Sequence, residues 1–166
     1  MAIGPIMDVM SQLIEAHEQL LALSEQKTEV IVRNNVEELN RIVGKESRLT
    51  AHIASLDQQR VSAVGQYLTA KGYRPHPYIT VSDIVKLIVK MEEKQAIQEA
   101  QRKLLNTIER LKEVNGQNQQ LIEQSLTYIE YSLDLIVGPP DDEATYQHPA
   151  NQYAGTKRSG LFDTRA

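Results

Sequence analysis

The sequence contains no cysteine and no tryptophan, and Phe162 is its one phenylalanine. Without cysteine the chain can form no disulfide framework, no thiolate nucleophile and no thiolate ligands for zinc or an iron–sulfur cluster. Aromatic residues make up 5% of the chain, which is too few for a core or a pocket built on bulky aromatic anchors. The core must therefore be aliphatic.

An excess of basic residues is also missing. Lys and Arg number 18 against 22 Asp and Glu, giving a net charge of -4 over 166 residues. A basic stripe is the usual footprint of phosphate binding, so we expect no nucleic-acid partner. No run approaches the roughly 20 apolar residues that cross a bilayer, and the N-terminus lacks the basic and apolar regions of a secretory signal. These absences predict a single cytoplasmic domain.

The residue patterns of catalytic and metal sites are absent as well. We find no glycine-rich phosphate loop, no GxSxG and no HExxH. The histidines are far apart in sequence and have no second ligand at one-turn spacing, so we expect no bound metal, no cofactor and no enzymatic activity. These histidines are His17, His52, His76 and His148.

Apolar residues at alternating spacings of three and four, by contrast, are abundant and indicate packed helices. A first stripe covers residues 6–31, and a second covers 39–67 in a different phase. Asn34 and Asn35 separate them, and Asn35 with Glu38 matches an N-cap followed by an acidic residue. The pattern predicts a break near Asn35, although a continuous helix with a stutter also fits.

A connector with two prolines occupies residues 73–78, directly after Gly72, which stands where a helix C-cap glycine is expected. Thr80 and Asp83 then form an N-cap pattern. The apolar residues at 84–88 include β-branched side chains that would also suit a strand, but no partner strand is evident.

Residues 91–137 contain no proline and predict one helix about 70 Å long. After it, residues 138–166 are too polar to offset the entropy of ordering. The sequence thus predicts an all-α, elongated antiparallel helical bundle, resembling a coiled-coil hairpin, in a domain of residues 1–137. A flexible C-terminal tail of residues 138–166 should follow.

Polar residues interrupt the stripes at several positions. The first stripe turns polar at Ser24 and Lys27, where we expect looser packing. Glu46 and Arg60 occupy positions where leucine is expected, and we interpret each as meeting a polar group across the helix pair. Residues 115–118 should be a local weakness of the long helix, since a helical glycine costs about 1 kcal/mol.

The last third of the long helix, residues 121–136, carries apolar side chains around much of its circumference. Two interpretations fit this girdle equally. It can be the middle of a three-helix core, or it can be partly exposed and accept an amphipathic helix from a partner.

The run from Asn35 to Leu49 (NVEELNRIVGKESRL) resembles the second helix of the FlgN-type flagellar export chaperones. Residues 118–129 (NQQLIEQSLTYI) resemble part of their last helix. The ending at 162–166 (FDTRA) is similar to the ends of such proteins from Gram-positive bacteria. The resemblance covers nearly the whole chain.

The resemblance implies a chaperone that binds the C-terminal helices of the two hook–filament junction proteins before secretion and delivers them to the type III export gate at the membrane. It implies gate docking through Tyr146 or Tyr153. Client contacts would be made by the girdle residues Leu121, Ile122, Leu126, Ile129, Leu133 and Ile136.

Two rivals to this function stay open. One is a self-associating coiled-coil adaptor, because a heptad seam does not show whether it packs within one chain or in a homodimer. The other is a helical enzyme or metal carrier, against which the absence of a ligand cluster weighs.

Overall fold

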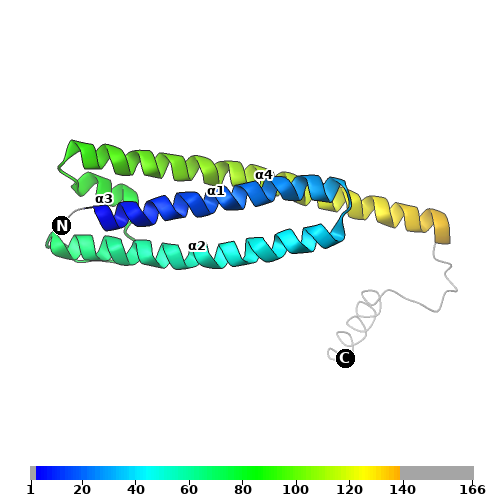
Figure 1. Cartoon of the computed structure of the whole chain (residues 1–166), viewed down its shortest axis with the longest axis horizontal. Helices are drawn as coiled ribbons and strands as arrows, with labels where there is room; N and C mark the ends of the chain where they lie inside the picture. The colour runs from blue at the N-terminus through cyan, green and yellow to red at the C-terminus, as the bar shows by residue number, and fades with distance from the viewer. Residues whose placement is uncertain (1–2, 139–166) are drawn as a thin grey trace, which may run out of the picture. The chain divides into compact units, whose positions relative to one another are not determined.

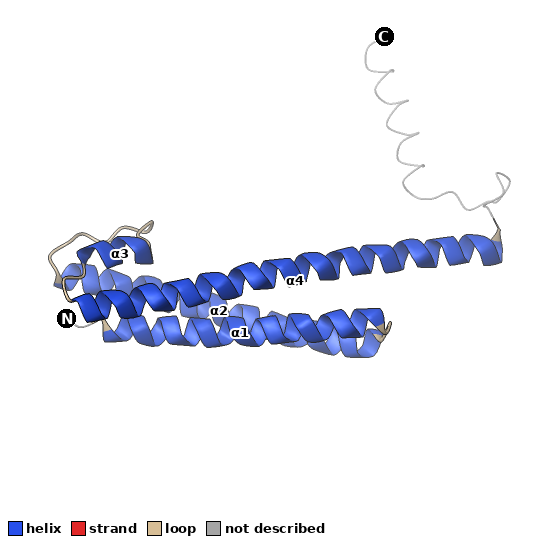
Figure 2. Cartoon of the chain, turned by 90° about the horizontal axis from the view of Figure 1, so that it is seen from above, coloured by secondary structure: helices blue, strands red, loops and turns tan. Residues whose placement is uncertain are grey.

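The computed structural model describes residues 3–138, and all regular secondary structure in that range is helical (Figure 2). The predicted all-α fold is confirmed. No helix in the described range is long and apolar enough to span a membrane. The four helices are α1 (Gly4–Val32), α2 (Val36–Ala70), α3 (Val81–Leu87) and α4 (Met91–Val137).

The chain divides into two compact units, of which the first ends at Gln124 and the second begins at Ser125. The described part of the second unit is the end of α4, which stops at Val137. The predicted tail of residues 138–166 lies, apart from Gly138, outside the described residues.

In the first unit, α1 and α2 run antiparallel, residues 91–124 of α4 lie alongside them, and α3 lies near one end (Figure 1). Ion pairs join Lys103 to Glu18 and Arg110 to Glu25, at 3.6 and 4.0 Å. Residue numbers rise together in both pairs, so α4 runs parallel to α1.

A turn, not a stutter, connects α1 and α2. Asn34 has a φ of 55°, in the left-handed region that asparagine tolerates better than most residues. The Asn35 side chain then accepts a hydrogen bond of 3.1 Å from the Glu38 backbone amide. The predicted break and its N-cap are confirmed.

The other predicted helix ends are confirmed too. Gly72 adopts a φ of 82° directly beyond α2. Thr80 and Asp83 form a reciprocal capping box at the start of α3, and the hydrogen bonds from Thr80 lower the pKa of Asp83. Residues 81–87 are helical, which excludes the strand alternative for most of the 84–88 segment.

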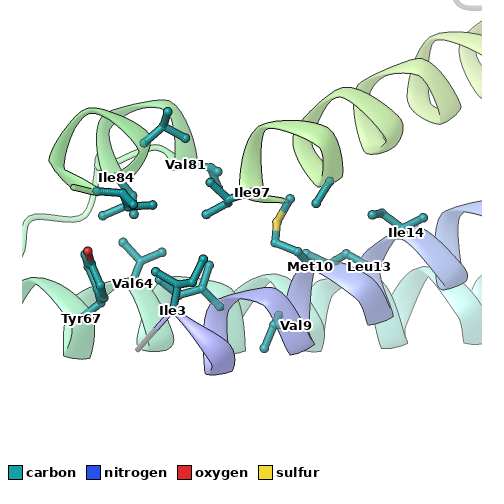
Figure 3. Close-up of a cluster of buried hydrophobic side chains, with 14 of the residues drawn as sticks. Ile3, Val9, Met10, Leu13, Ile14, Val64, Tyr67, Val81, Ile84 and Ile97 are labelled. Carbon is teal, nitrogen blue, oxygen red and sulfur yellow. The ribbon is translucent and has the colours of Figure 1, made fainter. Parts of the chain in front are cut away.

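The core of the first unit is an aliphatic cluster to which all four helices contribute (Figure 3). Ile84 of α3 and Ile97 of α4 are completely buried, each with 0% of its surface exposed. Tyr67 is the one aromatic side chain of the cluster. An aliphatic core is therefore what this composition produces.

Candidate functional site

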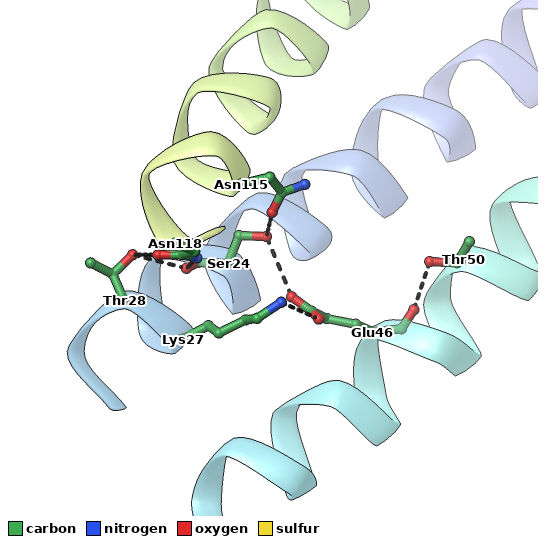
Figure 4. A network of polar contacts seen from close by, with 7 residues as sticks. All are labelled: Ser24, Lys27, Thr28, Glu46, Thr50, Asn115 and Asn118. Atoms are coloured by element: carbon green, nitrogen blue, oxygen red, sulfur yellow. Dashed lines mark hydrogen bonds and ion pairs between the residues drawn. The ribbon is translucent and has the colours of Figure 1, made fainter. Parts of the chain in front are cut away.

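A cluster of hydrogen-bonded polar side chains joins α1, α2 and α4 within the first unit (Figure 4). We call it the polar cluster. Except for Thr28, its members come from the stripe positions where the sequence departs from aliphatic residues. They are Ser24, Lys27, Thr28, Glu46, Asn115 and Asn118.

Ser24 stands at the centre of the polar cluster and is 1% exposed. Its hydroxyl lies 3.1 Å from Oδ1 of Asn115 on α4 and 3.5 Å from Oε1 of Glu46 on α2. One small side chain therefore contacts both neighbouring helices.

Asn118 fixes the register of α4 against α1. Its amide nitrogen donates to the Ser24 carbonyl at 2.9 Å, and its amide oxygen accepts from the Thr28 hydroxyl at 2.5 Å. The side chain is 2% exposed. A shift of α4 along α1 would break both bonds and leave a buried amide without partners, which is costly.

The ion pair between Lys27 and Glu46 links α1 to α2 at 3.1 Å. The two side chains are 19% and 16% exposed, so water screens the pair only in part. Glu46 therefore meets a polar group across the helix pair, as predicted.

One expectation about the polar stripe residues is wrong. The guanidinium of Arg60 pairs with Asp57 on the same helix, at 2.8 Å, and not across the helix pair. Ser24 itself is buried, yet a cavity of about 430 Å³ lined by Ser24, Lys27 and Glu46 lies beside it, which agrees with the looser packing expected there. Residues 115–118 remain helical within α4, and Asn115 and Asn118 hydrogen-bond to α1, while the local weakness expected at the glycine stays a prediction.

A signal for the polar cluster was present in the sequence. Polar stripe residues occur on all three long helices, in the halves that meet once α1 and α2 form a hairpin. To predict which of these residues pair, one must know the axial position of α4 relative to α1 and α2. A heptad pattern does not give that position.

The polar cluster has the chemistry of a structural element. Among the described residues, no buried side-chain nitrogen or oxygen lacks a hydrogen-bond partner. No group of three His, Asp or Glu residues within 3–138 is placed to hold a metal ion. The cluster thus positions helices and leaves no buried polar group without a partner.

Replacing Asn118 by alanine should lower the free energy of unfolding by about 1–3 kcal/mol, since two buried hydrogen bonds are lost. Replacing Gln117, its exposed neighbour on α4, by alanine should change stability by less than about 0.5 kcal/mol. Urea unfolding followed by circular dichroism compares the two variants. Equal stabilities would show that the Asn118 bonds do not hold α4.

A second feature lies at the end of α4, where large apolar side chains are exposed. Leu126, Ile129, Leu133 and Ile136 are 56%, 50%, 55% and 81% exposed. We call these four residues the apolar stripe. They follow one another at spacings of three, four and three, so they share one face of the helix.

Of the other two girdle residues predicted to contact a client, Leu121 is half-buried and Ile122 is 36% exposed. Both belong to the first unit. Of the two interpretations of the girdle, exposure fits the apolar stripe and partial burial fits Leu121.

The charges beside the apolar stripe are all of one sign. Between residues 113 and 137 the sequence has no Lys or Arg. Glu130 follows Leu126 by one turn and Asp134 follows Glu130 by one turn, which places both carboxylates along one edge of the stripe. The stripe therefore favours a partner helix with an apolar face and basic residues beside it.

The two tyrosines expected to dock at an export gate, Tyr146 and Tyr153, lie outside the described residues.

Comparisons with known proteins agree with the resemblance seen in the sequence. The model of the family described as FlgN protein matches residues 1–154. A protein of Bacillus subtilis (strain 168) named uncharacterized protein YvyG is 29% identical over 167 residues, covering 100% of both chains. No solved structure matches. The chain therefore belongs to the FlgN family of flagellar export chaperones.

Proposed function

We propose that this protein binds the C-terminal helices of hook–filament junction proteins through the apolar stripe and delivers them, in the cytoplasm, to the type III export gate. Leu121 and Ile122 would extend the contact toward the first unit. The observation that carries the proposal is the exposure of the stripe, whose four side chains are each at least half exposed.

The physical reason is the free energy of burying the stripe. Burial of an aliphatic side chain contributes about 1.5–3 kcal/mol, and a client helix with its own apolar face would cover all four together. Binding of this kind places anchors at one-turn spacings in a groove or along a helix face. The client's apolar face would be covered at the same time, which prevents premature assembly.

The polar cluster supports this function indirectly. It holds the first-unit part of α4 in register with α1 through Asn118, and the apolar stripe follows on the same helix. None of these steps requires a nucleotide or a metal ion, and we propose no enzymatic activity.

The test is complex formation with a C-terminal fragment of a junction protein. Size-exclusion chromatography with light scattering should show a 1:1 complex. A fragment of the same protein that lacks the C-terminal helix should form none and is the matched control. No complex with the full fragment would reject the chaperone role for that client.

Removing residues 138–166 should leave client binding unchanged within about twofold, because the stripe ends at Ile136. Isothermal titration with the same fragment measures the effect. Loss of binding would place the client contact in the tail.

The gate contact is proposed for Tyr146 or Tyr153, on the strength of the family resemblance. Replacing each tyrosine by alanine separately should leave the client complex intact. One of the two should abolish capture of the loaded chaperone by the gate's cytoplasmic domain.

A further inference from the structure

A groove between α1 and α2, within the first unit, is not used by the proposed client contact. Its volume is about 520 Å³, and Ala22, Leu23 and Leu49 supply apolar lining. Lys45, Arg48 and His52 of α2 also line it. We call this the cationic groove.

The charge of the cationic groove is not neutralised within the described chain. No acidic residue lines it, and neither Lys45 nor Arg48 has a carboxylate partner among residues 3–138. Arg48 donates one long hydrogen bond, 3.4 Å, to the Gly44 carbonyl of its own helix. By contrast, Lys27 is neutralised by Glu46.

The apolar lining of the groove lies beside two unpaired basic side chains. Such a surface would bind a helix that has an apolar face with acidic residues along one edge. The end of α4 has this chemistry, because Glu130 and Asp134 stand one turn apart beside the apolar stripe. Lys45 and Arg48 are likewise about one turn apart on α2. Neither acidic residue has a basic residue close to it in sequence.

We propose that the cationic groove binds residues 125–137 of a second copy of this chain. Leu126, Ile129 and Leu133 of one copy lie on Leu23 and Leu49 of the other, and Glu130 and Asp134 pair with Lys45 and Arg48. Each chain carries both surfaces, so two copies can exchange their helix ends and close a symmetric dimer.

Such a dimer covers the apolar stripe when no client is present. A client helix and the second copy then compete for the same stripe, and client binding dissociates the dimer. This competition rests on the proposed function, whereas the self-association does not.

The experiment measures the molar mass of the full chain by sedimentation equilibrium over a range of concentrations. We expect a monomer–dimer equilibrium that weakens as salt is raised, because two ion pairs contribute. The K45E/R48E and E130K/D134K variants should each raise the dimer dissociation constant at least tenfold. Combining all four substitutions should bring the dimer dissociation constant back to within about threefold of the value for the unmodified chain, since the charges are then exchanged between the two surfaces.

The matched control is R33E/R74E, which changes the net charge by the same amount at two exposed arginines that do not line the groove. This variant should have a dimer dissociation constant within about twofold of that of the unmodified chain. Circular dichroism of every variant checks that the helices are retained.

A second measurement does not depend on how the α4 variant folds. A fluorescent peptide of residues 121–138 should bind the full chain, and K45E/R48E should weaken that binding at least tenfold. A peptide with E130K/D134K should prefer the K45E/R48E protein.

A chain that is monomeric at all concentrations would overturn the proposal, and so would a dimer unaffected by K45E/R48E. Failure of the four-substitution variant to regain association would do the same. The client complex should survive K45E/R48E, so loss of the dimer alone is distinguishable from failure of the chaperone function.

Discussion

Replacing Leu126 and Leu133 together by alanine is expected to weaken client binding by about two orders of magnitude. Both side chains belong to the apolar stripe and are 56% and 55% exposed, which makes them available as anchors. Truncating an anchor of an interface costs at least about 1–2 kcal/mol, and about 2.8 kcal/mol in total corresponds to a hundredfold change. Titration calorimetry with the junction-protein fragment measures the loss.

Helix content and stability should change little in this double variant, because neither leucine is buried in the single chain. The matched control is Leu105→Ala, an equally exposed leucine of α4 at 52%, which lies in the first unit and should not affect binding. If the double variant unfolds, the two leucines are core residues and the client surface lies elsewhere.

Replacing Ile97 by alanine should lower the free energy of unfolding by about 2–5 kcal/mol, whereas the same change at Ile136 should alter it by less than about 0.5 kcal/mol. The two isoleucines lie on the same helix but differ completely in burial, at 0% and 81% exposed. Truncating Ile97 removes contacts with the aliphatic cluster and leaves a cavity. Truncating Ile136 removes apolar surface that is already in water.

Urea unfolding of both variants and of the unmodified chain, followed by circular dichroism, gives the change in the free energy of unfolding for each variant. Because the substitution is identical, helix propensity contributes nearly equally and cancels in the comparison. A large loss at Ile136 would show that the end of α4 is packed in solution. Client binding would then require this segment to open first.

Local features of the structure were predictable because their causes lie within a few residues. The N-cap at Asn35, the left-handed Gly72 and the Thr80–Asp83 box each depend on one side chain meeting a nearby backbone group. The stripes likewise follow from helical periodicity. Helix ends and helix faces could therefore be assigned without a tertiary structure.

The partners of the polar stripe residues could not be predicted from local sequence in the same way. Glu46 and Arg60 occupy equivalent stripe positions, yet Glu46 pairs across helices and Arg60 pairs within its own. The difference depends on what stands opposite each residue. Lys27 and Ser24 stand opposite Glu46, whereas Asp57 lies one turn before Arg60 on the same helix and needs no second helix.

The sequence by itself determined that the chain is helical, where α2 and α3 begin, and that its core is aliphatic, because capping, periodicity and composition act locally. The tertiary structure decided which polar residues meet in the polar cluster and which apolar residues of α4 are buried. Ile97 and Ile136 lie on the same helix and differ in exposure, since burial depends on neighbours that are distant in sequence. The surface proposed to bind clients is therefore defined by the absence of such neighbours around the apolar stripe in the described chain.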